Sequence, residues 1–206
     1  MVLLKIIMES YLWDAARDGD IETVTRLLNE HGVNPNIADA DGWTALHYAT
    51  AGDTEHDILE TLLRAGANPN AKDNFGETPF FFVTDVMSAK ILMDAGAHYS
   101  RDETDNDGDT VLHCFSSDGR IEVVHFLLTE ADGRMLVNIQ NKEGNTPLHE
   151  AVEAGSQGTV EVLLEHGFAD PTILNDSCQS AIDLTRISAT VTINPVYKLR
   201  RSGAKF

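Results

Sequence analysis

The segment GNTPLHEAV at residues 144–152 has three close relatives within this chain of 206 residues. They are GWTALHYAT at 42–50, GETPFFFVT at 76–84 and GDTVLHCFS at 108–116. The threonines of the four segments lie 34, 32 and 36 residues apart, and weaker copies begin at Ser10 and Ser180, each 34 residues from its neighbour. A period of about 20–50 residues is typical of proteins built from stacked repeats.

A second pattern follows most of these segments. Apolar residues recur there at steps of three and four, as with Ile121, Val124 and Leu128, which predicts a helix with one buried face. These stretches end at or near a glycine, which commonly follows a helix C-terminus. Threonine before proline in TPLH and TPFF favours a helix start, because the hydroxyl caps the helix and proline fits its first turn. Each unit is therefore predicted to hold two helices.

The TPLH motif and its spacing resemble the ankyrin repeat, whose signature is T-P-L-H-x-A with a period of about 33 residues. The resemblance covers residues 10 to 204. It implies an all-α solenoid, a stack of helix-turn-helix units with β-hairpin loops, in a single domain over 1–206 that is stabilised by contacts between neighbouring units. The expected units, with capping units first and last and a shortened third unit, are 1–36, 37–70, 71–104, 105–138, 139–173 and 174–206.

The third and fourth units depart from the pattern. In the third unit Thr78 and Gly96 are 18 residues apart, whereas the equivalent Thr44 and Gly66 are 22 residues apart. Phe81 also replaces the motif histidine. One or both helices of the third unit must therefore be shorter. In the long return loop of the fourth unit, Met135 and Leu136 could either cover the core or stand exposed.

Three histidines occupy the fourth place of the motif: His47, His113 and His149. Because each belongs to a different unit, a shared catalytic or metal site is the weaker interpretation. The resemblance implies that they hydrogen-bond the backbone of adjacent turns. The sequence holds no G-x-S-x-G, H-E-x-x-H or P-loop motif, so the chain is predicted not to be an enzyme and to use no cofactor.

A calcium loop is the alternative interpretation of one stretch. Glu103, Asp105 and Asp107 precede Gly108 at the spacing found in the first half of a helix-loop-helix calcium loop. The template also requires a bidentate glutamate at its twelfth position, where this chain has Cys114. The glycine matches the turn glycines of the other units. We therefore expect a hairpin turn here and no metal.

The charge of the chain is strongly acidic. Asp and Glu number 33 against 15 Lys and Arg, and every acidic residue lies in the first 190 residues. Such a surface repels nucleic acid and anionic membranes and favours a basic protein partner. Acidity also serves solubility, which is the alternative interpretation.

The cysteines and the hydrophobic stretches bear on the compartment. Cys114 and Cys178 lie far apart and outside any CxxC pattern, which argues against a disulfide scaffold or a zinc site. The apolar run near the start, VLLKIIM, is too short to span a bilayer. The expected location is the cytoplasm, the nucleus or both.

Partner contacts in ankyrin proteins fall on hairpin tips and inner helices, so the resemblance implies the contact positions. Trp43 and Phe75 are the most specific, because large aromatic residues dominate interface hot spots. Trp43 could instead lie flat over the neighbouring hairpin. The predicted tip residues are Ala40, Asp41, Trp43, Asn74, Phe75, Glu77, Asn106, Asp107, Asp109, Lys142, Glu143 and Asn145. The predicted inner-helix residues are Arg17, Asp18, Ser117, Asp118, Glu153 and Ala154.

The sequence thus predicts a non-catalytic, monomeric protein-binding module. A rigid, preformed acidic surface would lose little entropy when it binds a basic protein segment. A chaperone, an adaptor, an inhibitor and a microbial effector acting in a host cell all fit such a module. The competing class is a substrate-recruiting or regulatory subunit of an enzyme complex, and a third is a structural protein without a tight partner.

Overall fold

The computed structural model describes residues 2–52, 56–187 and 191. The chain forms two compact units, Met1–His98 and Tyr99–Phe206. The single domain expected from the sequence stays a prediction. Within the described residues, the hairpin loops carry isolated antiparallel bridges, such as Ala38–Thr44 and Leu174–Ser180, and no extended strands. The helical repeat architecture predicted from the sequence is confirmed.

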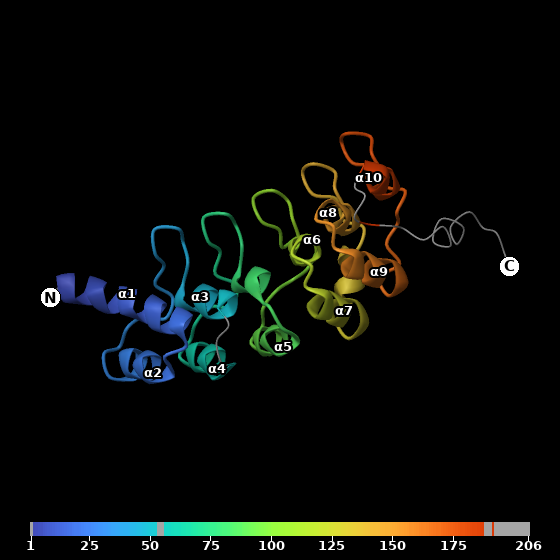
Figure 1. The fold of residues 1–206 in the computed structure, drawn as a ribbon. Helices are drawn as coiled ribbons and strands as arrows, with labels where there is room; N and C mark the ends of the chain where they lie inside the picture. Colours follow the sequence, from blue (N-terminus) through green and yellow to red (C-terminus); the bar gives the residue numbers. More distant parts are fainter. Residues whose placement is uncertain (1, 53–55, 188–190, 192–206) are drawn as a thin grey trace. The chain divides into compact units, whose positions relative to one another are not determined.

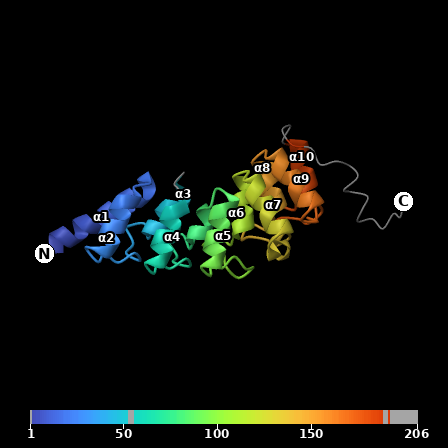
Figure 2. The ribbon, with the colours of Figure 1, turned by 90° about the horizontal axis from the view of Figure 1, so that it is seen from below.

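The first unit has two layers of helices. The inner layer holds α1 (Val2–Asp18), α3 (Ala45–Ala51) and the short 3₁₀ helix η1 (Pro79–Phe82). The outer layer holds α2 (Ile21–Asn29), α4 (His56–Arg64) and α5 (Val86–Asp94). The hairpin loops project from this unit on the side away from the outer layer (Figure 1). Seen from below, α2, α4 and α5 lie side by side in that order (Figure 2).

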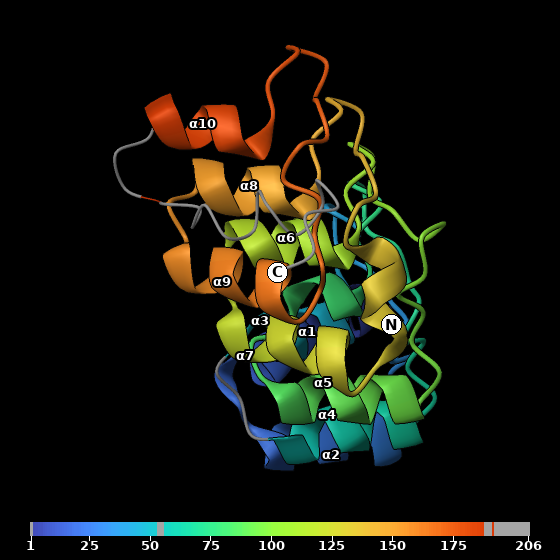
Figure 3. The same cartoon turned by 90° about the vertical axis from the view of Figure 1, so that its right-hand side faces the viewer.

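The second unit repeats the same two layers. Its inner helices are α6 (Val111–Ser117), α8 (Pro147–Glu153) and α10 (Ala181–Ile187). Its outer helices are α7 (Ile121–Thr129) and α9 (Gln157–Glu165), and the 3₁₀ helix η2 (Asp132–Leu136) lies in the return loop after α7. Figure 3 shows α6, α8 and α10 stacked on one another, with α7 and α9 in the second layer. The second helix predicted for the last unit falls outside the described residues.

The core lies between the layers and between successive helix pairs. In the first unit Leu46, Ile58 and Leu62 are fully buried, and Leu112 and Leu127 are equally buried in the second. Burying one such side chain contributes about 1.5–3 kcal/mol, so each pair depends on its neighbours for most of its stability. The open question about the fourth return loop is also answered. Leu136 is buried, whereas Met135 is 56% exposed.

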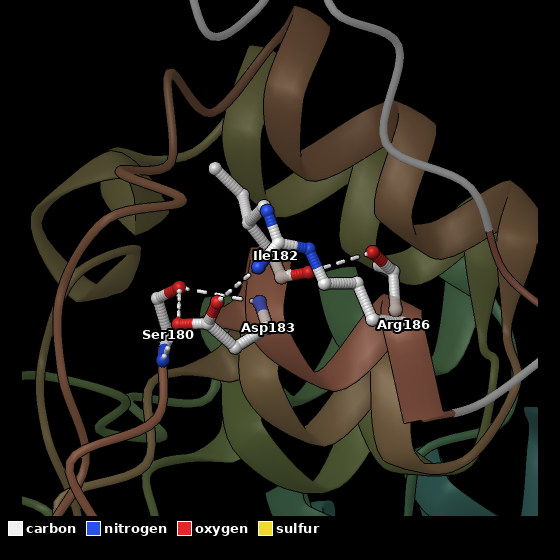
Figure 4. Close-up of polar contacts among 5 residues, drawn as sticks. Ser180, Ile182, Asp183 and Arg186 are labelled. Carbon is white, nitrogen blue, oxygen red and sulfur yellow. Dashed lines mark hydrogen bonds and ion pairs between the residues drawn. The ribbon is translucent and has the colours of Figure 1, made fainter.

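The inner helices begin as the sequence predicts. Thr44, Thr110 and Thr146 are N-caps in extended conformation, and proline takes the first position of α8 and η1. In α10, Ser180 and Asp183 replace the threonine and histidine of the motif. The Ser180 backbone N–H and hydroxyl donate to the Asp183 carboxylate at 3.1 and 2.6 Å (Figure 4). The starts of α3, α6, α8 and α10 are thus capped reciprocally.

In the third repeat the inner helix is the short one. η1 has four residues, against seven in α3, α6 and α8, whereas α5 keeps the nine residues of the other outer helices. Asp85 caps α5 soon after η1 ends, and its carboxylate accepts from the Met87 and Ser88 N–H groups. Phe81 has no ring nitrogen, and the Thr78 hydroxyl beside it is buried without a hydrogen-bond partner.

Candidate protein-binding surface

Five hairpin tips share a turn of six residues that ends at the N-cap of the inner helix. The first residue of each turn is Asp or Asn, and its side chain accepts from the backbone N–H groups two and four residues later. Asp39, for example, accepts from Asp41 and Trp43, both at 2.9 Å. The first residues are Asp39, Asp73, Asp105, Asn141 and Asn175. They hold the turn in shape, a role that the sequence analysis missed although all five precede a Thr or Ser by the same distance.

The second and third places of each turn point to solvent. All eight residues predicted as contacts at these places are exposed: Ala40, Asp41, Asn74, Phe75, Asn106, Asp107, Lys142 and Glu143. Phe75 is 61% exposed and is the largest exposed hydrophobic side chain on the described tips. Adjacent tips are tied together, because the Asn74 N–H donates to Asp41 and the Lys142 N–H donates to Asp107, each at 3.0 Å. These places form a continuous edge within each unit.

The fifth place of the turn faces inward instead. Trp43, Glu77 and Asp109 are half-buried, and Asn145 is only 3% exposed. The Asn145 amide donates to Glu150 at 3.0 Å and accepts from Asn175 at 2.9 Å. The side chain of Asn145 is therefore a structural link between tips, and it does not belong to the exposed surface on which the sequence placed it.

The motif histidines link each repeat to the hairpin of the next repeat. In His47, His113 and His149, Nδ1 accepts from the N-cap threonine N–H at 3.1 Å. The Nε2–H group donates to a backbone carbonyl in the next hairpin, at 3.3 Å for His47 and 3.1 Å for the other two. Both ring nitrogens are thus used, which fixes the neutral tautomer with its proton on Nε2. The predicted structural role of these histidines is supported by this geometry.

A pH dependence of stability follows from these histidines. Burial lowers the pKa of His47, His113 and His149, so below about pH 6.5 the unfolded chain binds protons that the folded chain does not. Each histidine can contribute a slope of up to about 1.4 kcal/mol per pH unit, or about 4 for the three together. We expect the free energy of unfolding to be constant from pH 7 to 8 and to fall as the pH drops through 6.5.

Urea unfolding at closely spaced pH values checks this expectation. The variant His125→Ala is the control, because His125 is exposed and should leave the profile unchanged. A free energy of unfolding that stays level, or that rises towards pH 5.5, would contradict the neutral, buried state of the three histidines.

In the first unit the inward-facing surface is aromatic. Trp43 lies between Tyr48 of α3 and Phe82 of η1, with ring centroids 5.1 and 4.7 Å from its own. The Trp43 indole N–H donates to Asp73 at 3.0 Å and the Tyr48 hydroxyl donates to Asp39 at 2.6 Å. The hydrogen bond to Asp39, with burial, raises the pKa of Tyr48 to about 12. Of the two alternatives for Trp43, the structure shows packing against the neighbouring hairpin.

In the second unit the equivalent surface is made of carboxylates and amides. Glu150 takes the place of Tyr48 and accepts from the amides of Asn145 and Asn141, at 3.0 and 3.2 Å. Asn141 also donates to Asp109 at 2.7 Å. Burial, together with the charges of Asp109 and Glu153, raises the pKa of Glu150. The carboxylates here therefore lie close enough to repel one another.

The same repulsion extends along the tips of this unit. Burial and the charge of Glu143 raise the pKa of Glu153 at the end of α8. Burial, with the charges of Asp109 and Asp107, likewise raises the pKa of Asp105 against the hydrogen bonds that its carboxylate accepts. Lys142 is the basic residue on these tips, and its ammonium donates to the Asn106 carbonyl. We call Asp107, Asp109, Glu143, Glu150 and Glu153 the acidic surface.

The predicted residues at the ends of the inner helices are all exposed, but several are already paired. The Arg17 guanidinium contacts Asp14 at 2.9 Å and Asp18 at 3.0 Å. Asp118 pairs with Arg120 beyond the end of α6. The remaining members are Ser117, Glu153 and Ala154. The structure thus joins Glu153 to the acidic surface, and pairs Arg17 and Asp118 with charges of their own segments.

The comparisons with known proteins agree with this architecture. A family model described as ankyrin repeats (3 copies) matches residues 8–73 and 85–175. The chain is 34% identical to human rabankyrin-5 over 74% of its length, and 30% identical to human mitochondrial disaggregase over 96%. It spans 13% and 27% of those two proteins.

Two further relatives match over most of their own length. The chain is 27% identical to the ankyrin repeat-containing protein P1E11.10 of Schizosaccharomyces pombe, covering 92% of this chain and 87% of that protein. A solved structure of the predatory endopeptidase Bd0816 from Bdellovibrio bacteriovorus in complex with immunity protein Bd3460 matches with a TM-score of 0.72 and 27% identity, covering 87% of this chain and 92% of the matched chain. In the described residues no helix is both long and apolar enough to cross a membrane. The chain belongs to the ankyrin repeat family.

Proposed function

We propose that this protein is a non-catalytic binding module whose acidic surface holds a basic segment of another protein. Ankyrin repeats generally mediate protein–protein interaction. The observation that carries the finer proposal is the gathering of carboxylates on the acidic surface, where the Asn141 amide donates to both Asp109 and Glu150. Burial first, and then the charges of neighbouring carboxylates, raise the pKa of Glu150 and Glu153 there. Repulsion of this kind destabilises the free protein and is relieved when a cation arrives, so it favours a basic partner.

An inhibitor or immunity role is the form of this function with the most support. The matched complex from Bdellovibrio bacteriovorus pairs an immunity protein with an endopeptidase. The match covers most of the present chain and most of the one chain of the complex that it aligns with. A rigid stack can occlude a partner surface without chemistry of its own, because binding costs it little conformational entropy. A substrate-recruiting or regulatory subunit is the alternative, and it predicts that a catalytic chain co-purifies.

Charge neutralisation on the acidic surface tests the proposal. The variant Asp107→Asn, Glu143→Gln, Glu150→Gln, Glu153→Gln removes four charges while keeping acceptors for the local hydrogen bonds. We expect it to weaken capture of basic proteins at least tenfold, and we expect capture by the natural chain to fall as salt rises from about 0.05 to 0.5 M, because screening shortens the reach of exposed charges.

The matched control removes the same number of charges from α7, its C-cap and α9 of the same unit. It is Glu122→Gln, Glu130→Gln, Glu161→Gln, Glu165→Gln, all at exposed positions. The captured proteins are identified by mass spectrometry, and the main one is then titrated by calorimetry. Equal losses from the two variants, an acidic main partner, or capture that ignores salt would each overturn the proposal.

A further inference from the structure

The aromatic surface of the first unit is built from three rings at related places. Tyr48 and Phe82 occupy the same position in successive inner helices, and Trp43 on the hairpin bridges them with centroid distances of 5.1 and 4.7 Å. The neighbouring His47 is buried, and its ring centroid lies 5.9 Å from that of Trp43. The other three residues, Trp43, Tyr48 and Phe82, are each partly exposed. We call Trp43, Tyr48 and Phe82 the aromatic cluster.

The polar edges of the cluster are already occupied. The Trp43 indole N–H donates to one oxygen of Asp73, and the Tyr48 hydroxyl donates to one oxygen of Asp39. These bonds fix the orientation of two of the rings and satisfy their only donors. What the cluster can offer a ligand is therefore ring surface, together with the negative charge of the two carboxylates.

Those two charges have no cationic partner in the part of the chain that the structure describes. Asp39 and Asp73 each accept two backbone N–H groups and one aromatic donor, and neither forms an ion pair with a described basic side chain. Burial lowers the pKa of His47, and the charges of Asp73 and Asp39 act against that lowering. Both carboxylates therefore lie close enough to His47 for their charges to act on it, and they would attract a cation that reached the cluster.

We propose that the aromatic cluster, whose rings are hydrogen-bonded to the half-buried Asp39 and the buried Asp73, binds an arginine side chain of the protein partner. This inference rests on the proposed function and deepens it by naming the group that the first unit recognises. A guanidinium is planar and weakly hydrated, so it can stack on tryptophan or phenylalanine while the charge of the nearby carboxylates attracts it. An ammonium group is more strongly hydrated and gains less from ring surface.

The second unit does not repeat this site. The residues that correspond to Tyr48 and Phe82 are Cys114 and Glu150, and Asp109 corresponds to Trp43. The two units therefore make different demands on a partner: general positive charge at the acidic surface, and one arginine at the aromatic cluster. A partner with several basic residues for the acidic surface, and one separate arginine for the aromatic cluster, would satisfy both demands.

Two tryptophans make the proposal directly testable by NMR. The Trp43 indole N–H lies in the cluster, and the Trp13 indole N–H donates to the Ile37 carbonyl at 3.1 Å, which makes it an internal reference. The probes are the capped peptide Gly-Arg-Gly and the same peptide with citrulline, which is neutral and nearly isosteric. With the whole chain, we expect saturable shifts of the Trp43 signal with the arginine peptide alone, and no matching shift of Trp13.

Variants locate the effect. Phe82→Leu keeps apolar volume but removes a ring face, and we expect about fivefold weaker binding of the arginine peptide. Tyr11→Leu on α1 is the matched control in the same unit, at a residue that is 57% exposed, and it should leave binding unchanged. Circular dichroism establishes that both variants are folded. The inference is wrong if citrulline shifts Trp43 equally, or if Phe82→Leu binds as tightly as the natural chain.

The same titration separates this inference from the proposed function. If Trp43 responds to arginine but neutralising the acidic surface leaves capture unchanged, the aromatic site stands and the acidic-surface proposal fails. If capture depends on the acidic surface but Trp43 is silent, the inference fails and the proposed function stands. Silence of Trp43 together with capture that does not depend on the acidic surface overturns both.

Discussion

Replacing His113 with alanine is expected to lower the free energy of unfolding by about 4 kcal/mol. The His113 side chain is 1% exposed and links the Thr110 N–H, at 3.1 Å, to the Asn145 carbonyl of the next hairpin, also at 3.1 Å. Alanine would leave the Thr110 N–H buried without a partner and would open a cavity, and each of these effects costs about 1–3 kcal/mol. It would also remove the bond to the Asn145 carbonyl, which would keep only the Asn141 N–H as a donor. Urea unfolding followed by circular dichroism measures the change.

Two further variants define the origin of this effect. His113→Gln can still accept from the Thr110 N–H, as glutamine does in a capping box, so it should lose less stability than alanine. His125→Ala removes an exposed histidine from α7 of the same unit and should change the free energy of unfolding by less than about 0.5 kcal/mol. If His113→Ala lowers the free energy of unfolding by less than about 1 kcal/mol, the link between successive repeats carries little energy.

The role of these histidines could be predicted because its causes are local or periodic. The bond to the N-cap threonine spans three residues, and the bond to the next hairpin spans one repeat, so both recur wherever the TPLH motif does. The same regularity predicted the paired helices and their caps. It also exposed the shortened third unit, since a missing turn changes the spacing of the motif. Which helix had lost the turn could not be read from spacing alone, because either helix could absorb it.

The direction of individual side chains could not be read from the period. The sequence treats Trp43 and Asn145 as equivalent tip residues, yet each is held by partners about 30 residues away in the next hairpin. Trp43 finds the Asp73 carboxylate and the Phe82 ring there, whereas Asn145 finds Asn175. Their partners differ because the tip sequences differ, and only three-dimensional neighbours show it. Phe75 remains on the surface as expected, with 61% of the residue exposed.

A glycine takes the fourth place in four of the five tips, and it supports a second large effect. We expect Gly144→Ala to lower the free energy of unfolding by about 3 kcal/mol, because two costs add. The backbone at Gly144 has φ +75°, which an L side chain tolerates poorly, and a Cβ there would lie 2.7 Å from both the backbone nitrogen and a carboxylate oxygen of Asp176. Thermal and urea unfolding of the single variant measure the sum.

Cys178 provides the reverse experiment at the same place of the next tip. Its φ is +57°, so the residue carries the conformational cost, but its N–H still donates to the Asn175 carbonyl at 2.9 Å as Gly144 donates to Asn141. Cys178→Gly should therefore raise the free energy of unfolding by about 0.5–1 kcal/mol, since relief of the left-handed backbone exceeds the added freedom of glycine in the unfolded chain. A loss at Gly144 that clearly exceeds the gain at Cys178 would show that close approach of the next hairpin makes this glycine obligatory. If Gly144→Ala instead costs no more than Cys178→Gly gains, backbone conformation alone accounts for the glycine, and the packing of one tip on the next contributes nothing measurable.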